Sequence, residues 1–237
     1  MQTKINLMVY FAVWRRPEIT ELCLMGIERM RSHPAYSIQA FAVISEPEMI
    51  PLMNQYDIKW VMHENMPLGK KKNYGLKALN HFDFDYLMEI GSDDLVTDYL
   101  LNQYLEYFGK YDFFGISDCL YIESETGECR RQLTNASTYG AGRVISRKVL
   151  EMIDWTLWPD NISRGMDNAS IRNIKQFGIE FHKVKPGICP GLIDVKSSEN
   201  IWKFNYFIGT EYDFCNASEY ISQKEIDKLK SLQHAIA

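Results

Sequence analysis

Short apolar runs alternate with helical patterns through the N-terminal part of the chain. Residues 5–13 (INLMVYFAV) are almost continuously apolar and rich in β-branched and aromatic side chains, which is typical of a buried strand. Pro17 suits the first turn of a helix that we expect to reach residue 31. The same reasoning predicts strands at 37–45, 58–63 and 84–90, and helices at 70–81 and 98–108. Strand–helix alternation with short connections indicates right-handed βαβ units and a mostly parallel sheet.

The pattern becomes less regular after residue 110. Residues 113–123 and 129–133 flank a polar turn at 124–127, which indicates a hairpin. We expect helices at 145–153 and 168–177, a last strand at 179–185, and an amphipathic terminal helix at 224–234. Because no repeat, low-complexity tract or linker interrupts the chain, residues 1–237 are predicted to form one domain.

Composition narrows the class of protein. A hydrophobic fraction of 46% with 13% aromatic residues excludes disordered and fibrous classes. The formal net charge of −5 argues against a general nucleic-acid binder, which usually carries a basic surplus. Five scattered cysteines without a CxxC pair argue against a disulfide framework or structural zinc. With no secretory leader pattern and no apolar window of about 18 residues, we expect a soluble, cytoplasmic enzyme or binding domain without a transmembrane segment.

The sharpest local feature is Ser92-Asp93-Asp94, directly after the apolar stretch 84–90. Ligands of open α/β sheets bind beyond the carboxyl ends of the strands. Two adjacent carboxylates there repel each other, and a divalent cation such as Mg²⁺ or Mn²⁺ would relieve that repulsion. The alternative is that these residues cap the following helix, because Asp is a favoured N-cap. The motif alone supports both interpretations equally.

Basic residues gather at the same predicted edge of the sheet. Arg15 and Arg16 follow the first strand, Glu46 follows the second, and Lys70-Lys71-Lys72 begin a helix. A lysine run is usually a solvated face, and cations at a helix N-terminus oppose the helix dipole. A bound anion would offset that cost, since helix N-termini and lysines both attract phosphate. A diphosphate bridged to a metal in one cleft would satisfy all these groups.

The order of four segments, VWRRPE, ISEPE, LGKKKNYGL and a strand ending in GSDD, resembles family 2-type glycosyltransferases of the GT-A fold. The resemblance covers about residues 5–100, and more loosely 138–195. It implies an α/β fold with a mostly parallel central sheet flanked by helices. It also implies a nucleotide-sugar-binding half at about 1–110, an acceptor-side half at about 111–222 and a C-terminal helix at 223–237. The implied reaction moves a sugar from a nucleotide-diphosphate sugar to a glycan or other hydroxyl acceptor, with Mn²⁺ or Mg²⁺ and with inversion.

The resemblance also implies roles for individual donor-side residues. Asp94 would be the principal metal ligand, and Asp93 would contact the ribose or the metal. Gly91 stands where the family motif commonly begins with another Asp. The other implied donor-side residues are Arg15 and Glu46 near the base and ribose, Lys72 and Asn73 where the family often has Arg-Asn, and Asp194 with Lys196 at the metal or diphosphate.

On the acceptor side, residues 139–148 (YGAGRVISRK) resemble a glycine-containing segment of the same family. Asp167 follows, and the resemblance implies that it removes the proton from the acceptor hydroxyl, with Asp160 as the second choice. An ordinary helix N-cap is the alternative for Asp167.

Other side chains are weaker candidates. His182 is a possible third metal ligand, although an ordinary strand histidine is more common. Aromatic rings suit sugar faces, so the best candidates for stacking on a sugar are Trp155, Trp158 and Trp202, although we expect at least one of them to pack in the core.

Two other function classes remain open. A nucleotidyltransferase would usually need a glycine-rich loop after the first strand, where this chain has WRRP. A non-catalytic nucleotide- or glycan-binding module is supported by Gly91 in place of an acidic residue. The motifs of α/β-hydrolases, P-loop proteins and dinucleotide-binding proteins do not occur in the sequence.

Overall fold

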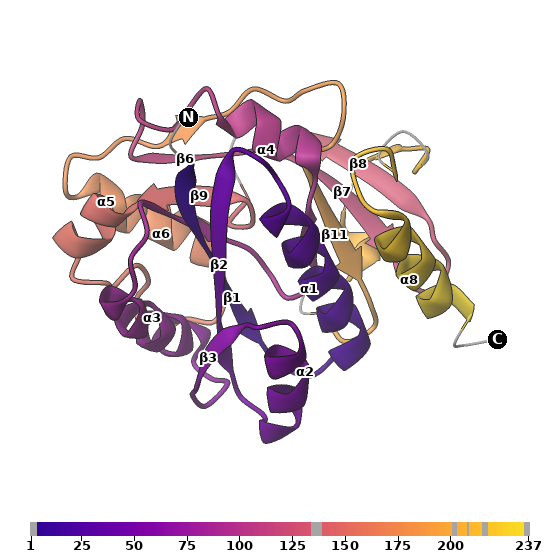
Figure 1. Cartoon of the computed structure of the whole chain (residues 1–237), viewed down its shortest axis with the longest axis horizontal. Helices are drawn as coiled ribbons and strands as arrows, with labels where there is room; N and C mark the ends of the chain where they lie inside the picture. Colours follow the sequence, from indigo (N-terminus) through magenta and orange to yellow (C-terminus); the bar gives the residue numbers. More distant parts are fainter. Residues whose placement is uncertain (1–3, 134–138, 201–202, 208, 215–217, 235–237) are drawn as a thin grey trace.

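The computed structural model describes residues 4–133, 139–200, 203–207, 209–214 and 218–234 (Figure 1). Among them, two sheets of seven and five strands lie beside each other. The larger sheet has the strand order β10 (His182–Lys183), β6 (Phe113–Gly115), β9 (Arg143–Ser146), β4 (Tyr86–Glu89), β1 (Ile5–Val13), β2 (Tyr36–Ile44), β3 (Lys59–Met62). Strand β9 runs antiparallel to β4 and β6, and the remaining neighbours are parallel.

The smaller sheet comes from the middle and the C-terminal part of the chain. Its order is β12 (Thr210–Glu211), β8 (Cys129–Leu133), β7 (Asp118–Glu123), β11 (Leu192–Lys196), β5 (Asp94–Val96). Strand β5 follows the loop after β4, so the chain passes directly from the larger sheet into the smaller one. This passage places the carboxyl end of β4 against the smaller sheet.

Helices cover both faces of the larger sheet. Along β1, Leu7, Val9 and Phe11 point to one apolar cluster and Met8 and Tyr10 to another, as expected for a strand buried on both sides. The first cluster contains side chains of α1 (Pro17–Arg31), α2 (Ile50–Gln55) and α4 (Asp98–Tyr104); the second contains side chains of α3 (Leu68–Ala78), α5 (Arg147–Met152) and α6 (Met166–Lys175). Helix α8 (Gln223–His234) lies along α1, and short 3₁₀ turns occur at Pro47–Met49, Leu79–His81 and Phe204–Tyr206 (Figure 1). No helix in the described segments has the length and apolar character needed to cross a bilayer.

The predicted strand–helix alternation of the N-terminal half is confirmed, and β1 and α1 have the expected bounds. The predicted helix at 145–153 is wrong at its start. Residues Arg143–Ser146 form β9, because they pair with both β4 and β6, and α5 begins only after Ser146. Ser146 Oγ caps that helix by accepting a hydrogen bond from the backbone N–H of Val149.

Two further strand predictions differ from the structure. The predicted strand 113–123 is two strands, β6 and β7, which belong to different sheets. The predicted strand 179–185 shortens to the two residues of β10. Strands β5 and β11 were not predicted, because β5 has only three residues and both depend on pairing between distant segments.

One buried amide joins α3 to the segment before α6. The Asn73 side chain donates hydrogen bonds to the backbone oxygen of Trp158 (2.6 Å) and to Asp160 Oδ1 (2.7 Å). Its oxygen accepts from the backbone N–H groups of Leu157 (3.0 Å) and Trp158 (3.2 Å). The residue is 2% exposed, so truncation would leave several buried polar groups without partners.

We therefore expect Asn73→Ala to lower the free energy of unfolding by about 2–3 kcal/mol. Urea denaturation measures the change. Asn80→Ala is the matched control, because Asn80 is exposed at the end of the same segment, and it should leave stability unchanged. Equal stabilities of the two variants would contradict this role of Asn73.

Candidate functional site

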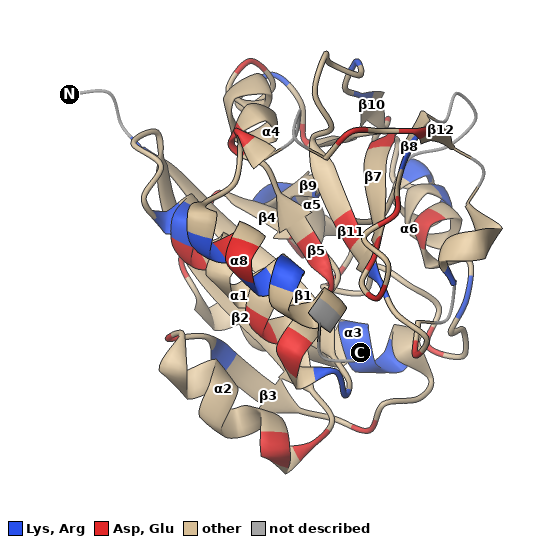
Figure 2. Ribbon diagram, turned by 90° about the vertical axis from the view of Figure 1, so that its right-hand side faces the viewer, with Lys and Arg blue, Asp and Glu red and all other residues tan. Residues whose placement is uncertain are grey.

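Three carboxylates meet where the two sheets join. The antiparallel register of β5 and β11 sets Asp94 directly opposite Asp194, and Asp93 precedes β5 (Figure 2). One oxygen of each carboxylate lies within 4.8 Å of the others. Like charges directly opposite each other in a sheet are destabilising, so this cluster requires compensation by a cation or a proton.

The turn at Gly91 sets the positions of two of these carboxylates. The Asp94 carboxylate folds back and accepts a hydrogen bond from the backbone N–H of Gly91. A Cβ atom at residue 91 would stand only 2.6 Å from Asp93 Oδ1 and 2.7 Å from Asp94 Oδ2. The departure from the family motif is therefore a steric requirement of this arrangement. The helix-capping alternative for Asp93 and Asp94 is wrong, because Thr97 caps α4.

The local environment shifts the pKa of each carboxyl group. Burial raises the pKa of Asp94 well above its usual range, and the charges of Asp194 and Asp93 raise it further. Burial also raises the pKa of Asp194 to about 6, although Lys196 opposes the shift. For Asp93, burial is outweighed by Arg16 and Lys196, and its pKa is lowered. Two of the three carboxyl groups thus favour a proton or a cation.

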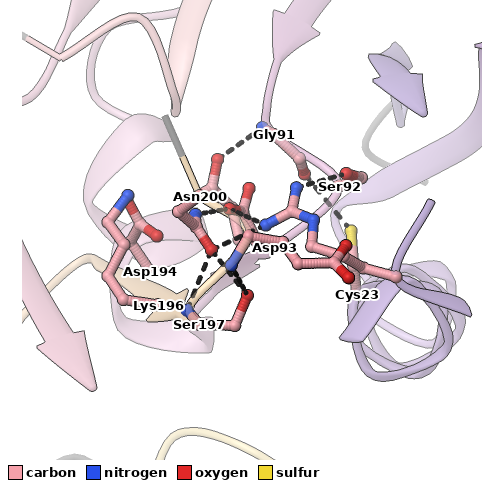
Figure 3. Close-up of polar contacts among 11 residues, drawn as sticks. Cys23, Gly91, Ser92, Asp93, Asp194, Lys196, Ser197 and Asn200 are labelled. Carbon is pink, nitrogen blue, oxygen red and sulfur yellow. Dashed lines mark hydrogen bonds and ion pairs between the residues drawn. The ribbon is translucent and has the colours of Figure 1, made fainter. Parts of the chain in front are cut away.

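Two basic side chains offset part of the charge. Arg16 Nη1 donates to Asp93 Oδ2 at 2.8 Å and to Asn200 Oδ1 at 2.9 Å, and Asn200 Nδ2 donates to Asp93 Oδ2 at 2.6 Å. Lys196 Nζ lies 2.6 Å from Asp194 Oδ2. Figure 3 shows Asp93, Asp194, Lys196 and Asn200, together with Ser197, whose backbone N–H and hydroxyl hold Asn200 in place. The segment 197–200 therefore lies against Asp93.

Sequence reasoning placed both Arg15 and Arg16 at this edge of the sheet but assigned no donor-side role to Arg16. It named the neighbouring Arg15, which is exposed and stacks over Trp14 with its guanidinium carbon 4.5 Å from the ring centroid. Both arginines follow β1, and both have a positive φ of 55°. Nothing in the local pattern shows which of the two points toward Asp93, so only the tertiary structure distinguishes them.

The carboxylate cluster fits a divalent cation. Asp194 Oδ1 is buried and has no hydrogen-bond partner within the described part of the chain. Asp94 is 4% exposed and lies between two like charges. Oxygen ligands of this kind are those that Mg²⁺ and Mn²⁺ prefer. Asp93, Asp94 and Asp194 are thus the residues that could hold such a metal, and His182 lies away from them, stacked on Tyr111 at the edge of the larger sheet.

A cavity of about 510 Å³ extends from these carboxylates to Asp167. Asp167 lies in the first turn of α6, and its carboxylate covers the backbone of Gly140. The capping alternative for Asp167 is wrong, since Gly165 occupies the N-cap position. Arg143, which is fully buried, donates from Nη1 to the Asp167 backbone oxygen at 3.2 Å and so holds this turn.

The lysine run at the start of α3 has three different environments. Lys70 is exposed, in agreement with a solvated position. Lys71 is fully buried and donates to the Val13 backbone oxygen at 2.6 Å and to Asn65 Oδ1 at 3.1 Å. Lys72 forms a buried ion pair with Glu89, a residue that the sequence analysis did not name. The only local signal of that pair was a Glu inside an apolar strand, together with the lysine that directly precedes Asn73.

A second cavity adjoins the first, and a third shares Arg16 and Glu199 with the second. The second, of about 480 Å³, shares Lys72, Asp93 and Lys196 with the first and also contacts Arg16 and Lys71. The third is wider, about 740 Å³, and contacts Arg15, Arg16 and Glu46. There, Glu46 Oε2 accepts a hydrogen bond from the Arg15 backbone N–H at 3.1 Å.

Some expected site residues lie elsewhere. Asn73 and Asp160 bond to each other, and neither contacts the three cavities. Trp155 and Trp158 are buried in the apolar core beneath α3, and Trp202 lies outside the described residues. The aromatic side chains that line the cavity beside Asp194 are Tyr121, Tyr139 and Phe207.

Comparison with solved structures shows a GT-A glycosyltransferase fold and confirms that expectation. No family model and no curated protein matches the chain by sequence. The structure is similar to S. aureus TarS 1–349, with a TM-score of 0.52 and 12% identity over 82% of this chain and 59% of that chain. It is also similar to the mannosyltransferase PcManGT from Pyrobaculum calidifontis in complex with GDP-Man and Mn²⁺. That comparison has a TM-score of 0.57 and 12% identity, and it covers 86% of this chain and 60% of that chain. The chain thus spans about three fifths of the length of these structures, and the likeness concerns the fold.

Lys71 generates a prediction about pH. Burial lowers the pKa of Lys71 from 10.5 to about 8, against the opposing charge of Glu46. Between these two values the unfolded chain binds a proton at Lys71 that the folded protein lacks. The free energy of unfolding should therefore gain a contribution of up to about 1.4 kcal/mol per pH unit as the pH rises through this window.

We expect Lys71→Met to remove that contribution, so that its stability rises less steeply than that of the wild type between about pH 8 and 10.5. Urea denaturation at several pH values measures both slopes. Lys70→Met, at the exposed neighbouring lysine, should keep the wild-type slope. Identical slopes for all three proteins would show that the pKa of Lys71 is not lowered in the folded protein.

Proposed function

We propose that this chain is a metal-dependent, inverting glycosyltransferase that moves a sugar from a nucleotide-diphosphate sugar to an acceptor hydroxyl. One observation carries the proposal: in a GT-A fold, the carboxylates of Asp93, Asp94 and Asp194 and the carboxylate of Asp167 line one cavity. The first three suit a metal at the departing diphosphate, and the last suits a base at the attacking hydroxyl. PcManGT, which has the same fold, was solved with GDP-Man and Mn²⁺.

The donor fits the cavities around the carboxylate cluster. We place its diphosphate at Asp93, Asp94 and Asp194, where a bound divalent cation would supply Lewis-acid stabilisation of the leaving group. The nucleoside would extend into the cavity that contacts Arg16 and Lys71, toward the neighbouring cavity that contacts Arg15 and Glu46. Each basic group near the diphosphate stabilises negative charge as the bond to the sugar breaks.

The acceptor fits the end of the 510 Å³ cavity that lies at Asp167. Asp167 is half-buried at its rim and would take the proton from the acceptor hydroxyl as that oxygen attacks the anomeric carbon. Arg143 fixes the backbone beneath Asp167 and so positions the carboxylate. A base on the side opposite to the diphosphate favours in-line attack, which inverts the configuration of the sugar. Tyr121, Tyr139 and Phe207 offer aromatic surface to sugar rings nearby.

The two alternative functions have less support. Gly91 was the argument for a non-catalytic module, but a larger residue there would collide with the carboxylates of Asp93 and Asp94. A nucleotidyltransferase would use the loop after β1 to hold phosphates, and in this chain Arg16 of that loop pairs with Asp93.

Donor binding is tested by thermal shift with a panel of nucleoside diphosphates, each with and without Mn²⁺. We expect the diphosphate of one nucleoside to raise the melting temperature of the protein, and to do so only when Mn²⁺ is present. A ligand at 100 times its Kd adds about 2.7 kcal/mol to the free energy of unfolding. Asp94→Asn should abolish this metal-dependent shift because it removes a ligand charge. Asp83→Asn, at an exposed position before β4, should retain it. If both variants keep the metal-dependent shift, Asp94 is not a metal ligand.

The role of Asp167 as the general base is tested with an activity assay. The assay measures the release of nucleoside diphosphate from a sugar donor in the presence of hydroxyl acceptors. Asp167→Asn should lower kcat by at least about 100-fold, because general-base catalysis commonly contributes that much. Its thermal shift with nucleoside diphosphate and Mn²⁺ should remain that of the wild type. Asp160→Asn should stay close to wild-type activity, since Asp160 faces Asn73. Loss of activity in Asp160→Asn but not in Asp167→Asn would identify Asp160 as the base.

A further inference from the structure

A row of polar side chains crosses the larger sheet beneath the proposed sugar site. The register sets Glu89 of β4 beside Tyr10 of β1 on one side and beside Arg143 of β9 on the other. All three are at least 97% buried, in strands whose other side chains are mostly apolar. A buried carboxylate in this place needs a physical explanation, because burying a charge costs free energy unless it is paired.

Only half of the Glu89 carboxylate has a partner. Oε1 accepts from Lys72 Nζ in a buried ion pair. Oε2 is buried and has no hydrogen-bond partner among the described residues. A buried, unsatisfied charged oxygen costs more than a lost hydrogen bond, and native proteins rarely keep one unless a water or a ligand satisfies it.

The surrounding contacts keep the pair rigid. The Tyr10 hydroxyl donates to the backbone oxygen of Lys72 at 2.6 Å in a buried contact, which fixes the first turn of α3. Lys72 Nζ lies 4.2 Å from the centroid of the Trp158 ring, so the aromatic face holds the ammonium from another side. The pair therefore presents one free acceptor oxygen, and the remaining N–H groups of Lys72, at a fixed place.

That place lies between the two ends of the reaction. Glu89 and Lys72 line the same cavity as the carboxylate cluster and Asp167. Glu89 is two residues before Gly91, whose backbone binds Asp94, and it pairs in register with Arg143, which holds the Asp167 turn. A sugar whose anomeric carbon lies between the diphosphate and Asp167 therefore has its ring next to Glu89.

We infer that Glu89 accepts a hydrogen bond from a hydroxyl group of the transferred sugar, while Lys72 donates to the same or the neighbouring hydroxyl. This inference rests on the proposed function. A carboxylate only accepts hydrogen bonds and an ammonium only donates them. Of two adjacent sugar hydroxyls, one can therefore donate its O–H to Glu89 while an oxygen accepts an N–H of Lys72. A sugar that lacks a hydroxyl there would leave Oε2 buried and unpaired, and the site would bind it less tightly.

The test compares binding of a nucleoside diphosphate with binding of its sugar derivative, in the presence of Mn²⁺. The probes are UDP with UDP-glucose and GDP with GDP-mannose, and calorimetry gives a Kd for each. The ratio of the two Kd values reports the contribution of the sugar. We expect Glu89→Gln and Glu89→Asp to reduce that contribution by at least about 10-fold, as for the loss of one charge-assisted hydrogen bond, and to leave the Kd of the diphosphate unchanged.

Glu106→Gln, at an exposed position, is the control and should keep the wild-type ratio. If Glu89→Gln fails to fold, as shown by its near-ultraviolet circular dichroism, Glu89→Asp still decides the matter because it keeps the charge beside Lys72. A folded variant with an unchanged ratio would overturn the inference and leave Glu89 a structural residue. Failure of the wild type to bind any nucleoside diphosphate of the thermal-shift panel in the presence of Mn²⁺ would overturn the proposed function, and this inference with it.

Discussion

The concentration of negative charge at the junction of the two sheets is the constraint around which the site is built. Pairing of β5 with β11 brings Asp94 and Asp194 face to face, and the turn at Gly91 adds Asp93. No fold adopts such an arrangement for stability alone, because like charges opposite each other oppose strand pairing. Arg16 and Lys196 offset part of the charge, and the remaining carboxylate oxygens are suited to a cation. The unfavourable charge is thus best explained as preparation for a ligand.

A second set of buried polar contacts ties the proposed donor side of the site to the proposed acceptor side. Helix α3 carries Lys72 toward Glu89 and, one residue later, Asn73 toward the segment that precedes α6. Arg143 then reaches from the sheet to the first turn of α6. Because each of these side chains is nearly inaccessible to water, their hydrogen bonds and charges act at low dielectric and hold the surrounding elements firmly. A rigid support of this kind is what a site needs to keep a base and a leaving group at a constant separation.

The sequence predicts the fold well where an element is long and strongly patterned. The pattern of β1 and α1 is unambiguous, because apolar side chains on both faces of a nine-residue strand leave little choice of structure. Prediction failed for β5, β9 and β11, which are three to five residues long and acquire their conformation from partners far along the chain. It failed in the same way for Arg16 and Glu89, whose partners Asp93 and Lys72 lie 77 and 17 residues away. Local patterns carry no information about such pairs.

The sequence by itself determined that the chain alternates strands and helices, and that carboxylates and cations gather beyond the ends of the strands. Both follow from local chemistry, since the period of apolar residues sets the element and the strand ends set the edge of the sheet. Only the tertiary structure decided which of these charges meet. It separated Lys72 from its neighbours Lys70 and Lys71, placed Asp194 opposite Asp94, and turned Asn73 away from the cavity to join α3 to the segment before α6. The physical reason is that side chains one residue apart on a helix or loop point in different directions, so their partners depend on which distant strand or helix packs against each face.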